Sequence, residues 1–144
     1  MSSDQIARRF MQFGAFLFLL GLASGLITGA MSNPRMGLSA HLEGVMNGTF
    51  LLAVGAIWRH VSLSSRLQSV TFWTFVYGTV VNWLSIQLAA LWGTGRMTPL
   101  AAPGREALGW QEAIVTFGLI SITVAMLLGS ALLLVGLMRP APSS

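Results

Sequence analysis

The stretch FMQFGAFLFLLGLASGLITGA, residues 10–30, contains 21 consecutive residues without a formal charge. At about 1.5 Å per residue, a helix needs roughly 20 such residues to cross the hydrocarbon core of a bilayer. Three further apolar stretches follow it, at residues 39–58, 67–92 and 113–138. The sequence therefore predicts an all-α, integral membrane four-helix bundle that forms a single membrane domain over residues 1–144. Its transmembrane helices are expected at about 9–31, 39–60, 66–92 and 111–138.

The composition of the 144 residues also favours a lipid-facing surface. Hydrophobic residues make up 54% of the chain and charged residues 8%, whereas an average soluble domain is about 25% charged. Because so few charges cannot solvate a globule of this size, an ordinary soluble domain and a disordered chain are both excluded. The chain has no cysteine, which excludes disulfides, thiolate metal sites, iron–sulfur clusters and covalently attached haem.

All eight basic residues are arginines, and against four acidic residues they give a formal net charge of +4. They lie singly or in one pair at the ends of the apolar stretches, which is typical of membrane-interface anchors and not of a nucleic-acid surface. Three of them, Arg35, Arg96 and Arg105, fall at one end of the expected bundle and the other five at the opposite end. The positive-inside rule then predicts cytoplasmic termini in a multi-pass protein of the cell inner membrane.

Polar side chains inside a membrane are costly, so the few in these stretches are candidates for function. With Ser39 as the N-cap of the second helix, His41 and Glu43 are expected in its first turn, near the outer edge of the hydrocarbon. There the helix dipole disfavours an imidazolium, so we expect His41 to be neutral, as a metal ligand must be. The full set of polar candidates is His41, Glu43, Asn47, Asn82 and Gln87.

Helical spacing separates the polar side chains of the second helix. His41, Gly44 and Gly48 follow an i, i+3, i+7 pattern and share one face. Glu43 and Asn47 form an i, i+4 pair on another face. The glycine face could accept a planar macrocycle ligated by His41, although glycines at this spacing more often serve close helix packing.

Each polar candidate also has a plainer interpretation. A lone interfacial histidine more often hydrogen-bonds a neighbouring helix or a lipid headgroup. Glu43 could interact with the helix dipole or pair with an arginine at the outer end of the bundle. Asn47, Asn82 and Gln87 could join helices through hydrogen bonds that contribute about 0.6 kcal/mol each on average. Trp83, next to Asn82 at mid-helix depth, is a candidate wall for an aromatic substrate.

The sequence NPRMGLSAHLEGVMNG, residues 33–48, resembles the signature of hydroxylaminobenzene mutase, and its His-x5-Asn-Gly core is similar to that of styrene oxide isomerase. The likeness runs over most of the chain and includes Asn82 and the sequence Trp110-Gln111-Glu112. It implies a compact four-helix subunit that assembles as a homotrimer with haem b between neighbouring subunits. By position, the resemblance makes His41 the axial iron ligand, and Asn47 and Asn82 polar groups of the substrate pocket.

Two positions depart from the pattern of styrene oxide isomerase. There a tyrosine follows the helix-three asparagine by four residues, whereas this chain has Ile86 at that place and a single tyrosine, Tyr77. That isomerase also has a small residue where this chain has Glu43. Both departures favour an arylhydroxylamine over an epoxide as the substrate.

The resemblance therefore implies a haem b-dependent isomerase that rearranges an arylhydroxylamine to a 2-aminophenol, with ferric haem as a Lewis acid. Glu43 would move the proton lost as the ring regains aromaticity, and Asn47 and Asn82 would orient the polar head. Trp83 and Ile86 would contact the substrate ring, and Gly44 and Gly48 would lie against the haem. Arg35, Arg96 and Arg105 would pair with the haem propionates or only anchor the outer interface.

Other functions compete with this one. An epoxide isomerase of the styrene oxide type, giving an aldehyde, is the nearest alternative. A small proton-coupled transporter would use Glu43 as its embedded carboxylate, but the expected place of Glu43 near a helix end and the lack of an inverted repeat count against it. A redox subunit usually needs two axial ligands, and His60 is expected roughly 28 Å from His41 along the second helix.

Overall fold

A computed structural model of the chain describes residues 1–139, and these residues form helices without strands. Helix α1 spans Ser3–Ile27, α2 Pro34–Ile57, α3 Ser65–Trp92 and α4 Gly109–Met138, and the short 3-10 turns η1 (Thr28–Ala30) and η2 (Trp58–His60) extend the first two. Each of the four is long and apolar enough to cross a membrane. The prediction of an all-α chain with four helices long and apolar enough to span a membrane is therefore confirmed.

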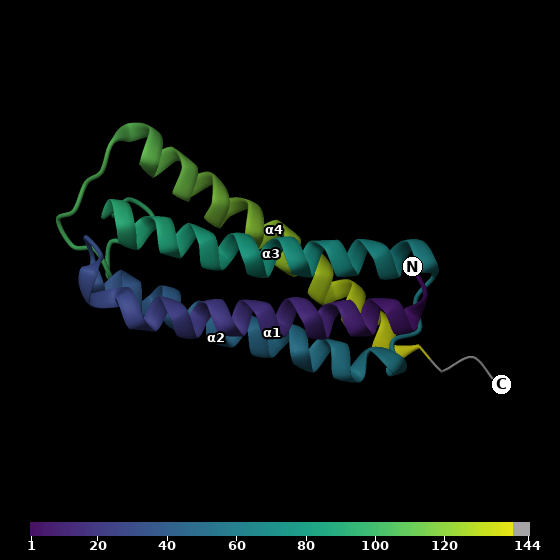
Figure 1. The fold of residues 1–144 in the computed structure, drawn as a ribbon. Helices are drawn as coiled ribbons and strands as arrows, with labels where there is room; N and C mark the ends of the chain where they lie inside the picture. The colour runs from purple at the N-terminus through teal and green to yellow at the C-terminus, as the bar shows by residue number, and fades with distance from the viewer. Residues whose placement is uncertain (140–144) are drawn as a thin grey trace.

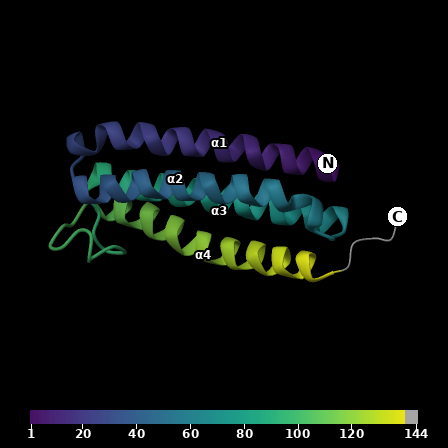
Figure 2. The ribbon, with the colours of Figure 1, turned by 90° about the horizontal axis from the view of Figure 1, so that it is seen from below.

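The helices pack as two pairs, α1 with α2 and α3 with α4, and α2 also contacts α3. Figure 1 shows α1, α2 and α3 running along one another while α4 crosses them obliquely. In Figure 2 the N-terminus and the end of α4 lie at the same end of the bundle, and the loop between α3 and α4 lies at the other. We call residues 93–108 the outer loop. The start of the chain and the end of α4 thus share one side of the bundle, and the assignment of this side to the cytoplasm stays a prediction.

The buried core has two parts along the bundle. Towards the termini an aromatic cluster surrounds Phe10, whose ring centroid lies 5.0 Å from that of Trp58 and 4.9 Å from that of Phe72. Towards the outer loop a second cluster contains smaller and more aliphatic side chains. Its members are Met31, Met36, Ala40, Ile86, Ala89, Ala90 and Val115. Residues 41–47 of α2 and 82–83 of α3 lie between the two clusters in sequence, so the polar candidates occupy a layer between two apolar ones.

Helix α2 begins five residues earlier than predicted, and this changes the depth of the candidate residues. Its N-cap is Asn33, whose side chain accepts a hydrogen bond from the Met36 backbone N–H, and proline occupies the first helical position, where its missing N–H costs nothing. The prediction that Ser39 caps this helix is wrong. His41 and Glu43 are therefore the eighth and tenth residues of α2, roughly 10 and 14 Å from its start. The helix dipole acts mainly within the first turn, and both residues lie beyond that turn.

Helices α1 and α2 approach closely through glycines on both sides. A Cβ built on Gly48 would lie 2.5 Å from the backbone N of Phe18, and one built on Gly14 would lie 2.7 Å from the carbonyl O of Gly48. Gly44 meets Gly21 of α1 in the same way. The glycines therefore serve close helix packing. Because α1 covers Gly44 and Gly48, the expectation that they offer an open face to a macrocycle is corrected.

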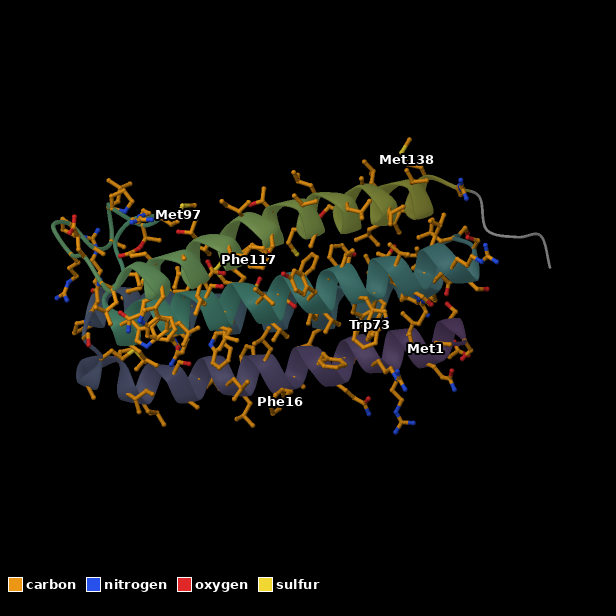
Figure 3. The ribbon with its side chains drawn as sticks, turned by 90° about the horizontal axis from the view of Figure 1, so that it is seen from above. Met1, Phe16, Trp73, Met97, Phe117 and Met138 are labelled. Carbon is orange, nitrogen blue, oxygen red and sulfur yellow. The ribbon has the colours of Figure 1, made fainter. Side chains whose placement is uncertain are left out.

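The outside of the bundle is covered with large apolar side chains. Phe16 of α1, Trp73 of α3 and Phe117 of α4 are each more than half exposed, and they are among the side chains labelled in Figure 3. Helix α4 is the least enclosed of the four, because only 17% of the residues in its apolar 18-residue stretch are buried. Such a surface is suited to lipid or to neighbouring subunits and not to water.

Candidate functional site

His41 projects from α2 towards α1. Its Nδ1 lies 2.8 Å from the carbonyl oxygen of Gly21. Because a carbonyl oxygen can only accept a hydrogen bond, this contact requires the proton on Nδ1, and in the neutral form of the ring Nε2 then keeps its lone pair. Nε2 itself has no hydrogen-bond partner among the residues that the structure describes. The histidine therefore presents one free ligating nitrogen.

The carboxylate of Glu43 is held by two amides. Its Oε2 accepts hydrogen bonds from Asn47 Nδ2 at 3.2 Å, one turn along α2, and from Asn82 Nδ2 at 2.6 Å, on α3. All three side chains are half-buried, and Oε1 of the carboxylate has no partner within residues 1–139. We call these three residues the carboxylate–amide cluster. The predicted pairing of Glu43 with Asn47 is confirmed, while the expected arginine or helix-dipole partner of Glu43 is replaced by Asn82.

Trp83 lies where α1, α2 and α3 meet. Its Nε1 donates to Ser24 Oγ at 3.3 Å, and that hydroxyl donates to the Leu20 carbonyl at 2.9 Å. A Cβ built on Gly44 would lie 2.9 Å from Trp83 Cδ1, so the indole rests on the α2 backbone one turn after His41. Ile86, by contrast, is 8% exposed and packs in the aliphatic core cluster.

The arginines at the outer end are all exposed. A pocket of about 660 Å³ lies in the outer loop, and Arg96, Arg105 and Glu112 contribute to its lining. Neither His41 nor Glu43 lines it. The structure thus brings Arg96 and Arg105 together at the loop, and Arg35 lies at the same end in the first turn of α2, but none of them joins the carboxylate–amide cluster.

Glu112 has a role that its sequence position suggests only weakly. It is 4% exposed, and its carboxylate accepts hydrogen bonds from the backbone N–H groups of Gly95 at 3.0 Å, Arg96 at 3.2 Å and Ala107 at 3.3 Å. It thereby ties both ends of the outer loop to the start of α4. The available signal was an acidic residue in the first turn of a helix after a loop rich in glycine and proline.

The only tyrosine does not replace the one found in styrene oxide isomerase. Tyr77 OH lies 2.7 Å from Ser121 Oγ, so it joins α3 to α4. The carboxylate–amide cluster joins α3 to α2 instead. Tyr77 therefore belongs to a different helix interface.

A single histidine such as His41 suits a metal ion whose other ligands come from a macrocycle. Residues 1–139 contain no group of three or more histidine or acidic side chains that could hold a metal ion. An imidazole whose other nitrogen donates to a backbone carbonyl is the usual arrangement of a ligating histidine. His41 is therefore suited to be one axial ligand of a porphyrin iron.

Comparisons with known proteins agree with the motif in α2. Residues 6–138 match the family described as Styrene oxide isomerase. Hydroxylaminobenzene mutase HabB of Ectopseudomonas oleovorans is 50% identical over 139 residues, which cover 96% of this chain and 84% of that protein. Hydroxylaminobenzene mutase HabA of the same organism is 44% identical over 127 residues, which cover 88% of this chain and 94% of that protein. No solved structure matches the chain. The chain therefore belongs to the styrene oxide isomerase family, and it is an enzyme of the isomerase class.

Proposed function

We propose that this protein is a haem b-dependent membrane isomerase that converts an arylhydroxylamine of the hydroxylaminobenzene type to a 2-aminophenol. The observation that carries the proposal is the pairing, on one helix, of a histidine with a free Nε2 and a glutamate with a free Oε1. The names of the two relatives, both hydroxylaminobenzene mutases, support the substrate class.

The reaction is an isomerisation, so its atoms balance without an oxidant or reductant. The N–O bond breaks, a C–O bond forms at the ortho carbon, that carbon loses a proton, and the nitrogen gains one. Bound haem would supply an iron Lewis acid that polarises the N–O bond. His41 would hold it through Nε2.

Glu43 would serve as the proton acceptor. Its Oε2 is engaged by Asn47 and Asn82, which fixes the orientation of the carboxylate. Its Oε1 would take the proton from the ortho carbon as the ring regains aromaticity, and the same proton can return to the nitrogen. A base must lie within about 2.6–3.2 Å of the group whose proton it moves, or act through one water. The two hydrogen bonds that join Glu43 to Asn47 and Asn82 would help to keep the carboxylate at such a distance.

The surroundings would hold an apolar ring and exclude water. Trp83 supplies an indole fixed by Ser24, and the amides of the cluster would bind the polar head of the substrate. Leu38 and Leu42, which flank His41 on α2, are 53% and 48% exposed, so one subunit leaves this side open. A homotrimer with haem between subunits would close it, and Arg35, Arg96 and Arg105 would then meet the propionates.

Styrene oxide isomerisation is a second candidate, because the matching family carries that description. An epoxide has no hydroxylamine nitrogen to reprotonate, so the proton transfer to nitrogen proposed for Glu43 has no counterpart in that reaction. The two activities can be compared directly on one preparation.

The first test uses protein purified in detergent. We expect a Soret band in the absorption spectrum, its loss in His41→Ala, and its retention in the matched variant His60→Ala, because His60 is exposed and contacts Arg59. Colourless wild-type protein, or full haem in His41→Ala, would overturn the haem assignment.

The second test offers hydroxylaminobenzene and styrene oxide to the haem-loaded protein without added nucleotide. We expect 2-aminophenol to form faster than the aldehyde. Faster aldehyde formation would replace the first candidate with the second, and turnover of neither compound would refute both.

A further inference from the structure

We infer that helix α1 positions His41, with Gly25 as the positioning residue and the Gly21 carbonyl as the acceptor that selects the tautomer. The consequence for haem rests on the proposed function, whereas the tautomer itself does not. The inference concerns two residues of α1 that do not ligate a metal.

Gly25 differs from Gly14, Gly21 and Gly48 of the α1–α2 interface in what it contacts. A Cβ on Gly14, Gly21 or Gly48 would first meet the backbone of the opposite helix. A Cβ on Gly25 would meet three atoms of one side chain, His41 Nδ1 at 2.8 Å, Cε1 at 3.2 Å and Cγ at 3.3 Å. The missing side chain at position 25 therefore makes room for the imidazole and not for a helix backbone.

The same contact controls the proton on the ring. Nδ1 reaches the Gly21 carbonyl at 2.8 Å while the ring packs against position 25. A methyl group there would push the ring away by several tenths of an ångström and lengthen or break this hydrogen bond. Without it, no other acceptor within residues 1–139 holds the proton on Nδ1, and Nε2 is no longer kept free for a metal.

The helix itself should tolerate the change. Alanine is a better helix former than glycine, so Gly25→Ala is not expected to weaken α1 through its backbone. Gly29, in the turn η1 that extends α1, provides the control, because a Cβ built there meets nothing within 4 Å. A defect in Gly25→Ala that Gly29→Ala lacks would therefore come from the contact with His41.

The first experiment measures the tautomer without haem. The full chain is labelled with ¹⁵N-histidine in a His60→Gln background, which leaves His41 as the single histidine, and the ring nitrogens are observed by NMR in haem-free protein. We expect a protonated Nδ1 and an unprotonated Nε2 in the parent and in Gly29→Ala, and a mixture of tautomers in Gly25→Ala. Equal spectra in all three would overturn the inference.

The second experiment measures haem binding in detergent by titration and by the ferric Soret spectrum. Loss of an orienting hydrogen bond to a ligand typically weakens metal affinity 10–100-fold, so we expect the Kd for haem to rise at least tenfold in Gly25→Ala and less than twofold in Gly29→Ala. If His41→Ala loses haem while Gly25→Ala binds it as tightly as the parent, the inference fails and the proposed function stands. If His41→Ala keeps its haem, the proposed function fails, and the NMR result alone decides the inference.

A double variant covers the case in which Gly25→Ala folds poorly. Removing the imidazole gives the methyl group room, so Gly25→Ala combined with His41→Ala should melt at the same temperature as His41→Ala alone. Equal destabilisation by Gly25→Ala with and without the imidazole would show that the contact is not the cause.

Discussion

Glu43→Gln separates the chemical role of the carboxylate from its structural one. The glutamine Oε1 can take the place of Glu43 Oε2 and accept from Asn47 and Asn82, so the bridge between α2 and α3 is kept. The oxygen that has no partner becomes an amide NH₂ group, which donates hydrogen bonds and cannot take up a proton. The substitution therefore removes the proposed base and little else.

The two roles predict effects of different size. Loss of a general base typically lowers kcat by about 10²–10⁴, which corresponds to roughly 3–5 kcal/mol of barrier at about 1.36 kcal/mol per tenfold. Hydrogen bonds between membrane helices contribute about 0.6 kcal/mol on average, and a neutral acceptor weakens each of the two bonds by about half. The free energy of unfolding should therefore fall by about 1 kcal/mol or less.

The assay follows 2-aminophenol formation from hydroxylaminobenzene by haem-loaded protein, with haem content and the unfolding curve measured on the same preparation. Glu106→Gln, in the exposed part of the outer loop, is the matched control and should keep full activity. The reasoning is refuted if Glu43→Gln retains its haem and turns over within threefold of the parent.

Three further predictions follow from contacts elsewhere in the bundle. Gly48→Ala places a methyl group against the α1 backbone and should lower the free energy of unfolding by about 1–3 kcal/mol. Gly29→Ala should leave it unchanged. Equal unfolding curves for the two variants would contradict the close packing of α1 and α2. Glu112→Ala leaves three backbone N–H groups without their acceptor, at a cost of about 1–3 kcal/mol for each group that stays buried. It should therefore speed tryptic cleavage at the outer-loop arginines at least tenfold. If Glu106→Ala has the same effect, the hydrogen bonds of Glu112 do not hold the loop. Tyr77→Phe removes a hydroxyl that contacts only α4, so kcat should stay within twofold of the parent, and a tenfold loss would place the tyrosine in the reaction.

The sequence predicted the helices well because their signal is local. Long uncharged stretches identify membrane spans by composition alone, and each of the four helices contains most of the stretch in which it was expected. The start of α2 was missed, although Asn33 followed by Pro34 is a common beginning of a helix. Ser39 was predicted as the cap instead.

The site could be predicted only in part. Helical periodicity correctly placed His41 on one face of α2 and Glu43 with Asn47 on another. It could not show that Asn82 completes the cluster, because that contact depends on the register between α2 and α3. Nor could it show what covers Gly44, since a stripe of glycines can accept either a helix or a flat ligand. The role of Gly25 was hidden for the same reason.

The dependence of His41 on the Gly21 carbonyl has a consequence for biogenesis. The second span alone carries an imidazole with no preferred orientation, because its acceptor belongs to the first span. The ring becomes oriented only when the first two spans have paired into a hairpin within the bilayer. A nascent chain whose first two spans have not yet paired therefore leaves this imidazole without a fixed orientation.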